Sequence, residues 1–216
     1  MNRKIIWILT FCFSLWMPGY AWAQPESFVP VADTSVVLKE LTASIQQTKT
    51  IQSKFRQLKC LDVLEEEIES YGEFYYARED RVRWEYMKPL TYLIVINGEN
   101  IYIKSDDEVK AYNSGSNKFF EQMNRILIGS IQGEILRDRE LFRILYYEDA
   151  GHYLAVLHPR KEAMQRMLDH VEMYFDKNDF SVSRLIFMEP AGDFTRIDFY
   201  DRIFNEHIPR EVFTVD

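Results

Sequence analysis

The chain has 216 residues and a formal net charge of −8 at neutral pH, with 34 acidic against 26 basic side chains. Phosphate binding relies on clustered lysine and arginine, so this balance argues against nucleic acid as the main ligand. It also disfavours a permanent electrostatic attachment to anionic lipid. A chain of this length is expected to form one domain.

The first 23 residues have the three parts of an export signal. Two basic residues precede an apolar stretch over 5–16, and Ala21-Trp22-Ala23 is a small-x-small cleavage site. The apolar stretch is shorter than the about 20 residues of a membrane-spanning helix. We therefore expect residues 1–23 to be cleaved and residues 24–216 to form a single exported, soluble domain. Removal of two positive charges takes the formal charge from −8 to −8 − 2 = −10.

Cysteine is rare in this chain, which has only Cys12 and Cys60. Because Cys12 lies in the export signal, Cys60 is left alone and no intrachain disulfide is expected. Gln24 rather than cysteine follows the predicted cut, so we expect no lipid anchor. A catalytic role for Cys60 is disfavoured because no histidine lies near it in the sequence.

Residues 34–49 have the spacing of an amphipathic helix, since Val37, Leu41 and Ile45 recur every four positions with polar residues opposite. Strands then dominate, and Asn97-Gly98 is the strongest hairpin turn signal. The strand candidates alternate apolar and polar residues between turn residues; they are 50–60, 68–78, 81–87, 91–97, 100–105, 108–113, 141–148, 151–158, 170–177, 181–189, 194–202 and 208–215.

Two further helical segments interrupt the strands, a longer one over 117–132 and a shorter one over 160–168. Many strands in meander order with few helices predict an α+β fold, a strongly curved antiparallel sheet forming an unclosed β-barrel covered by short α-helices. The candidate covers are 34–49 and 117–132. If they fill the concave side, the protein is a packed domain without a binding function. If they only roof it, a cavity can accept acyl chains, and each buried CH₂ contributes about 0.8 kcal/mol.

The stretch from Gly72 to Pro89 is the most informative part of the chain. It alternates apolar and polar residues on both sides of a charged turn, which is typical of a half-buried antiparallel hairpin. Arg78 continues its apolar face, and because an isolated guanidinium is costly to bury, we expect it at a rim. This combination suits a container for an apolar ligand with a polar head. The apolar face consists of Phe74, Tyr76, Val82, Trp84 and Tyr86.

These residues resemble the first hairpins of the LolA family of periplasmic outer-membrane lipoprotein carriers. The similar features of the hairpins are Gly72, Arg78 six residues later, Trp84 six further, Pro89 and the Asn97-Gly98 turn. Residues 50–57, which include Phe55, resemble the first strand of that family, and 157–159 and 175–199 resemble its later strands. The chain ends at Asp216 without the proline- and glycine-containing tail of that family, so no function of such a tail is carried over.

The resemblance implies a periplasmic chaperone that binds lipoprotein acyl chains in a hydrophobic cavity and carries them from the inner to the outer membrane. It implies that Arg78 steadies the closed, empty lid by hydrogen bonds that cargo entry breaks. The residues expected to line the acyl-chain cavity are Phe55, Phe74, Tyr76, Val82, Trp84 and Tyr86. The residues expected in the lid are Val37, Leu41, Ile45, Phe119, Phe120, Met123 and Leu127.

The partners implied by the resemblance are acylated lipoproteins as cargo, an inner-membrane ABC-type extractor that loads the carrier, and an outer-membrane acceptor where one exists. We expect a monomer in transient contact with the membrane, with no nucleic acid, no cofactor and no metal.

Each of these residues also has a plainer interpretation. Trp84 suits an ordinary sheet core, and Arg78 suits a solvated turn with neighbouring charges. The apolar stripe of 117–132 suits a static core. Its flanking glycines and its Met and Phe side chains favour a mobile lid instead.

Two other functions are open. The first is a periplasmic binder or sensor of another lipid or glycolipid on the same half-barrel fold. The second is an enzyme. The four histidines are far apart in the sequence, and there is no Gly-x-Ser-x-Gly, no phosphate-binding glycine loop and no His-Glu-x-x-His. A hydrolase with a carboxylate pair remains the enzyme alternative, because folding brings such pairs together. We expect a protein that is not an enzyme.

Overall fold

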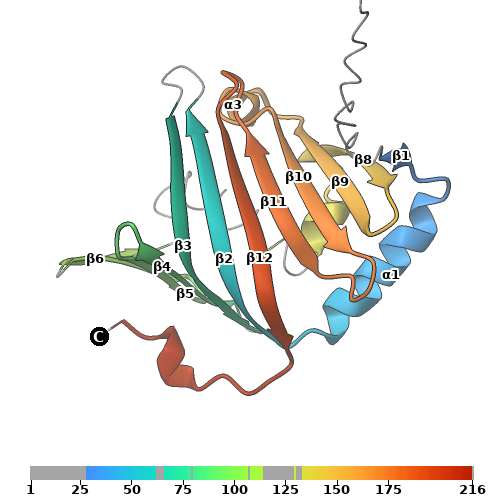
Figure 1. Ribbon diagram of the computed structural model, residues 1–216. Coiled ribbons are helices and arrows are strands. Elements are labelled where there is room, and N and C mark those ends of the chain that lie inside the picture. Colours follow the sequence, from blue (N-terminus) through green and yellow to red (C-terminus); the bar gives the residue numbers. More distant parts are fainter. Residues whose placement is uncertain are drawn as a thin grey trace, which may run out of the picture.

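The computed structural model describes residues 28–61, 66–78, 80–106, 108–113, 129 and 133–215. Within them, twelve strands form one antiparallel sheet (Figure 1). The strands are β1 (Val29–Pro30), β2 (Thr50–Leu61), β3 (Glu66–Ala77), β4 (Arg81–Lys88), β5 (Tyr92–Asn97), β6 (Asn100–Ser105), β7 (Glu108–Asn113), β8 (Phe142–Glu148), β9 (His152–Pro159), β10 (His170–Asp176), β11 (Val182–Met188) and β12 (Phe194–Phe204). The helices are α1 (Thr34–Gln47), η3 (Glu134–Arg137), α3 (Glu162–Gln165) and η4 (Arg210–Phe213).

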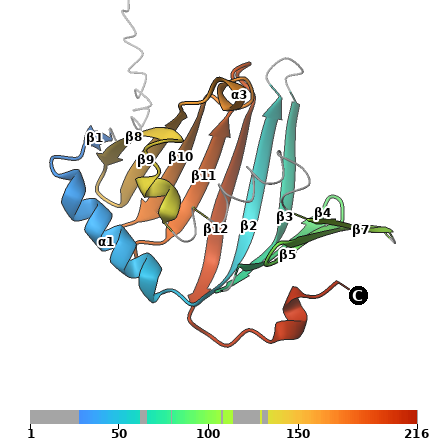
Figure 2. The same cartoon turned by 180° about the vertical axis from the view of Figure 1, so that it is seen from behind.

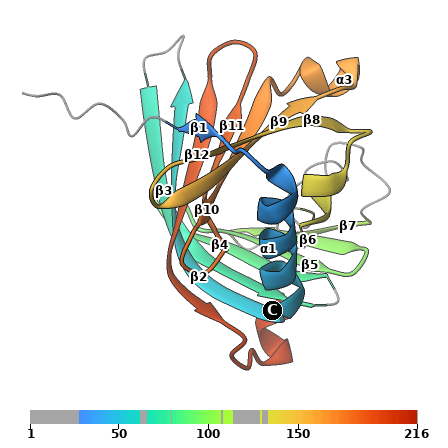
Figure 3. The same ribbon diagram turned by 90° about the vertical axis from the view of Figure 1, so that its right-hand side faces the viewer.

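The sheet is curved but not closed. Its strand order is β1-β8-β9-β10-β11-β12-β2-β3-β4-β5-β6-β7, so β1 and β7 form two separate edges. Two meanders, β8 to β12 and β2 to β7, are joined where β12 pairs with β2. Figure 3 shows the strands bending around α1, which lies on the concave side. The predicted fold, an unclosed and strongly curved antiparallel sheet with short helices, is confirmed.

Helix α1 forms where the sequence predicts it. Asp33 caps it by accepting a hydrogen bond from the Ser35 backbone N–H at 2.9 Å, and the helix ends at Gln47 with Thr48 as its C-cap. Val37 and Leu41 are buried in the main core on the concave side. The helix therefore crosses the concave face of the sheet and packs on it with one apolar stripe (Figure 2).

The C-terminal segment differs from the prediction. Residues 208–215 are not a strand: Pro209 precedes the short helix η4, and Ile208 and Phe213 are buried. These side chains pack with Leu93 and Val95 in a second, smaller core. The apolar residues of 208–215 pack against the face of the sheet opposite the main core. Their alternation with polar residues therefore does not reflect pairing with a neighbouring strand.

Three smaller differences from the prediction concern short elements. The helix expected over 160–168 is shorter, covering Glu162–Gln165, and neither the two-residue strand β1 nor η3 was predicted. Residues 117–132, apart from 129, lie outside the described residues. The predicted lid residues Phe119, Phe120, Met123 and Leu127 lie there too.

Candidate functional site

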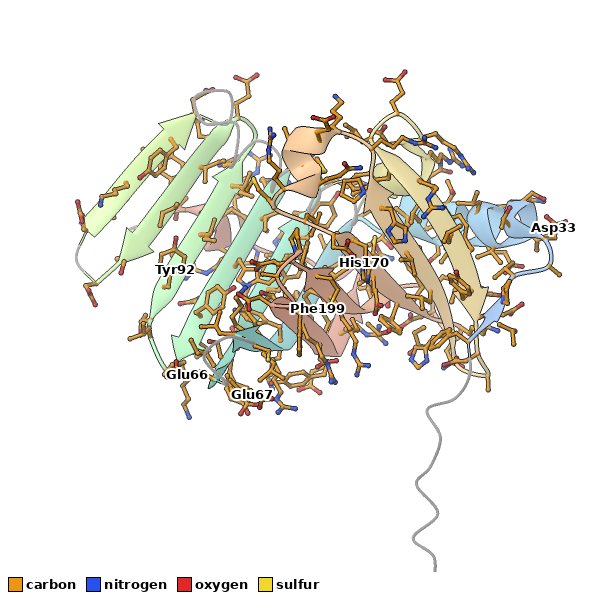
Figure 4. All side chains as sticks on the ribbon, turned by 90° about the horizontal axis from the view of Figure 1, so that it is seen from above. Asp33, Glu66, Glu67, Tyr92, His170 and Phe199 are labelled. Carbon is orange, nitrogen blue, oxygen red and sulfur yellow. The ribbon has the colours of Figure 1, made fainter. Side chains whose placement is uncertain are left out.

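An aromatic cluster occupies the concave face where β2, β3 and β4 run side by side. Phe55 contacts Trp84 and Tyr86 with ring centroids 5.0 Å apart in each case. Phe74 lies 5.2 Å from Trp84 and 5.8 Å from Phe199 of β12. Side-chain alternation produces this arrangement, because cross-strand pairing sets Phe74 beside Trp84. Figure 4 shows Phe199 among the side chains in the middle of the sheet.

The hairpin residues predicted to line a cavity are therefore brought together. Phe55, Phe74, Tyr76, Val82 and Trp84 are buried, and all belong to the main core. Tyr86 is partly buried, and its hydroxyl donates a hydrogen bond to Gln57 Oε1 at 2.8 Å. Burial raises the pKa of Tyr86 to about 12, so its hydroxyl stays protonated at any physiological pH.

A cavity of about 230 Å³ lies beside this cluster, beneath the C-terminal half of α1. Ile45 of α1 and Phe74 of β3 are the predicted site residues that line it. The other predicted cavity residues, Phe55, Tyr76, Val82, Trp84 and Tyr86, do not line it, although Trp84 contacts Phe74 and Phe199, which do. Val37 and Leu41 lie farther along α1 and do not line it either. Most of the remaining wall comes from β10, β11 and β12 and from the turn at 177–181, and its apolar members include Phe175, Phe180, Val182, Leu185, Phe199 and Phe204.

Arg78 lies at the rim of the sheet and holds the C-terminal end of α1. Its Nε donates a hydrogen bond to Thr48 O at 3.0 Å, and its Nη2 donates to Gln46 O. Its backbone N–H donates to Lys49 O at 2.9 Å. The last carbonyls of a helix have no partner within the helix and carry partial negative charge, so a guanidinium suits them. Arg78 is exposed, as a rim position requires.

Few polar contacts hold the rest of α1. Ser44 Oγ donates to Asp179 O at 3.0 Å across the cavity, and Arg137 Nη2 of η3 donates to Thr42 Oγ1 at 2.9 Å. Gly133, with φ +72°, lies against Ile45: a Cβ there would lie 2.7 Å from Ile45 Cδ1. Among the described residues, α1 is therefore secured by one apolar stripe and by these few polar contacts.

Sequence reasoning missed a second cluster, which contains two histidines. Pairing of β9 with β10 brings His158 and His170 together with ring centroids 5.3 Å apart. With Asp169 they place three potential metal ligands within 4.8 Å of one another. Burial, the neighbouring His170 and then Arg143 lower the pKa of His158. Spacing alone could not reveal this group, because the two histidines lie twelve positions apart in the sequence. Nearby Arg143 disfavours a cation.

Two other groups in the cavity wall were also missed, Ser53 of β2 and Arg202 of β12. Neither belongs to a recognisable motif, and Arg202 reaches the cavity only because β12 is irregular there. Among the described residues, no helix combines the length and the apolar character needed to cross a bilayer.

Comparison with known proteins agrees with this architecture. Residues 46–216 match the family model of the outer membrane lipoprotein carrier protein LolA. The outer-membrane lipoprotein carrier proteins of Pseudomonas paraeruginosa and Pseudomonas aeruginosa are 25% identical over 186 residues, 86% of this chain and 86% of theirs.

Solved structures are similar to this chain at low sequence identity. An uncharacterised conserved protein from Thermus thermophilus superposes with a TM-score of 0.50 at 11% identity, over 85% of this chain and 95% of that one. A LolA superfamily protein from Nitrosomonas europaea gives 0.43 at 9% identity, over 85% of this chain and 99% of that one. The family model spans most of the sequence, and the chain belongs to the LolA family of outer membrane lipoprotein carrier proteins.

Proposed function

We propose that this protein is a periplasmic chaperone that binds the acyl chains of lipoproteins under α1 and carries them from the inner to the outer membrane. The observation that carries the proposal is the apolar cavity between α1 and the sheet, whose helix α1 is held at its C-terminal end by Arg78. Family membership and the carrier names of relatives at 25% identity support it. The function is binding and transfer, not catalysis.

The size of the cavity favours a closed, empty state. Pockets for drug-sized ligands occupy roughly 300–1,000 Å³, and this cavity has about 230 Å³. Acyl chains therefore need more room than it offers. The movable wall is α1, because Ser44, Ile45, Gln47 and Thr48 line the cavity from its C-terminal half.

Arg78 is proposed as the latch of this state. Its bonds to Gln46 O and Thr48 O exist only while the end of α1 lies against the sheet. Cargo that lifts α1 breaks them, and their re-formation favours release. Delivery then requires no nucleotide at this protein, only that the acceptor binds cargo more tightly than the carrier does. An export signal over 1–23, an inner-membrane ABC-type extractor and an outer-membrane acceptor complete the proposed route.

Binding of a synthetic diacylated lipopeptide to the chain that begins at Gln24 tests the proposal. Trp84 is the sole tryptophan of that chain and contacts Phe74 and Phe199, both of which line the cavity. We expect its emission to shift on binding and its quenching by iodide to change. The same peptide without acyl chains is the control. Failure of the acylated peptide to bind would contradict the proposal.

The alternative, a binder or sensor of another lipid or glycolipid, is separated by identifying the lipids that purify with the protein. Bound glycolipid, without lipoprotein, would favour that alternative. Delivery of a loaded lipoprotein to acceptor membranes would favour the carrier.

A further inference from the structure

An irregularity in β12 turns an arginine into the cavity. Tyr200 pairs with Lys54 of β2, but the next pair is Ile203 with Gln52, so two residues of β12 lie opposite Ser53 alone. The first of them, Asp201, has φ +51° and is exposed. β-Bulges commonly re-aim a side chain near a binding site. Here the second residue, Arg202, lines the cavity next to Ser53.

Arg202 has only part of its hydrogen-bonding capacity satisfied. Its Nη2 lies 3.0 Å from Asp176 Oδ2 and 3.5 Å from Asp179 Oδ2. Its Nη1 is buried and has no hydrogen-bond partner among the described residues. Since 15% of the side chain is exposed, water has little access to this donor.

Ser53 is the second unsatisfied group in the same wall. It is 7% exposed and is the one polar residue in the buried set of the described chain. Its Oγ also lacks a partner there. Side-chain alternation on β2 puts it on the same face as Phe55, and its cross-strand neighbour is Phe74. Buried donors usually have a hydrogen-bond acceptor. Arg202 Nη1 and Ser53 Oγ are therefore two donors in this wall to which an acceptor atom of a ligand can bind.

The charges around Arg202 define the acceptor. Asp176 and Asp179 already surround the guanidinium, so a phosphate or a free carboxylate would meet two like charges. A neutral carbonyl oxygen meets no such repulsion, accepts hydrogen bonds and brings no donor of its own. Apolar side chains form much of the remaining wall, which suits a carbonyl attached to hydrocarbon.

We propose that Arg202 Nη1 and Ser53 Oγ bind the ester carbonyl oxygens of O-acylated glycerol, the group that carries the acyl chains. This rests on the proposed function, because the chains must enter this cavity. The diacylglyceryl groups of lipoproteins and of phospholipids share this chemistry. The site thereby selects ester-linked over ether-linked chains, which no apolar wall could do.

The test compares two synthetic lipopeptides with the same peptide and chain length, one with ester-linked and one with ether-linked chains. The wild-type protein is expected to bind the ester about tenfold more tightly, the effect of one or two hydrogen bonds. Arg202→Lys keeps the positive charge but removes the second guanidinium arm, and Ser53→Ala removes the hydroxyl. Each should bring the ratio of ester affinity to ether affinity towards one.

Arg184→Lys is the matched control, because Arg184 pairs with Asp198 and does not line the cavity. It should retain the preference. Equal wild-type affinity for both compounds would overturn this inference and leave the proposed function intact, whereas binding of neither would overturn both. A phospholipid with the same ester-linked chains forms the third arm. Whichever ester compound binds more tightly identifies the source of the diacylglyceryl group, and an ester preference in either supports the inference.

Discussion

The ring of Phe55 lies directly against Gly72 on the neighbouring strand. The two residues are cross-strand partners, and a Cβ at Gly72 would come 2.6 Å from Phe55 Cζ and still closer to the carbonyl oxygen of Glu85. The pairing of β3 with β4 also shifts register at this glycine. Glycine is therefore required here so that the Phe55 ring can reach Trp84 and Tyr86 and form the aromatic cluster.

Gly72→Ala should be among the more destabilising single-methyl additions in the protein. Because both backbone and ring must shift, we expect the free energy of unfolding to fall by about 2–3 kcal/mol, the upper part of the range for overpacked cores. Urea denaturation followed by circular dichroism measures it. Gly151→Ala is the control, since a Cβ there meets only Asp149 Oδ1 at 3.9 Å. Equal stability of the two variants would show that the Phe55–Gly72 contact relaxes freely.

Arg78→Leu should impair the release of cargo more than it impairs folding. Arg78 is exposed, so we expect the free energy of unfolding to change by no more than about 0.5–1 kcal/mol. Without the bonds to Gln46 O and Thr48 O, the closed empty state loses stability relative to the loaded one. The variant should therefore load lipoprotein and release it poorly to acceptor membranes, as measured by a transfer assay.

Lys110→Leu is the control for the removed charge, because Lys110 is exposed on β7 and forms an ion pair with Glu108 on the same strand. It should transfer cargo normally. Transfer at the wild-type rate by Arg78→Leu would refute the latch.

The parts of the fold that could be predicted from the sequence are those in which the local periodicity of apolar residues decides which side chains are buried. The hairpin face from Phe74 to Tyr86, the stripe of α1 and the rim position of Arg78 all follow from periodicity. The inward direction of Arg202 did not, because it depends on a two-residue irregularity in β12. The histidine pair depends on the pairing of β9 with β10, which single-strand patterns do not specify.

The ionised carboxylate of Asp176 should stabilise the fold only at pH values above its folded-state pKa. The Asn178 backbone N–H and then Arg202 lower its pKa below the usual value. A carboxylate with a depressed folded-state pKa stabilises the fold above the unfolded pKa of about 3.9, and that contribution is lost as the pH falls through the folded pKa. Asp176→Asn should cost about 2 kcal/mol at pH 7.

The cost of Asp176→Asn should shrink below pH 4, as measured by urea unfolding at a series of pH values. Asp201→Asn is the control: Asp201 is exposed, and its pair with Lys54 should contribute less than about 1 kcal/mol. A cost for Asp176→Asn that is independent of pH would contradict the assigned role of the ionised carboxylate.

A disulfide between α1 and the residue before η3 should lock the cavity. A Cβ built at Gly133 lies 3.7 Å from the Cβ of Ile45, within the 3.5–4.5 Å range typical of disulfides. In a Cys60→Ser background, the pair Ile45→Cys and Gly133→Cys should form under oxidation and tie α1 to η3. We expect the oxidised protein to take up lipopeptide much more slowly and the reduced protein to recover. Each single cysteine variant controls for the altered cavity wall and for the strain of a side chain at φ +72°. Uptake at the same rate in both redox states would show that cargo enters without separating α1 from η3, and the opening would then have to be sought on the other side of the cavity, between Ser44 and the turn that carries Asp179.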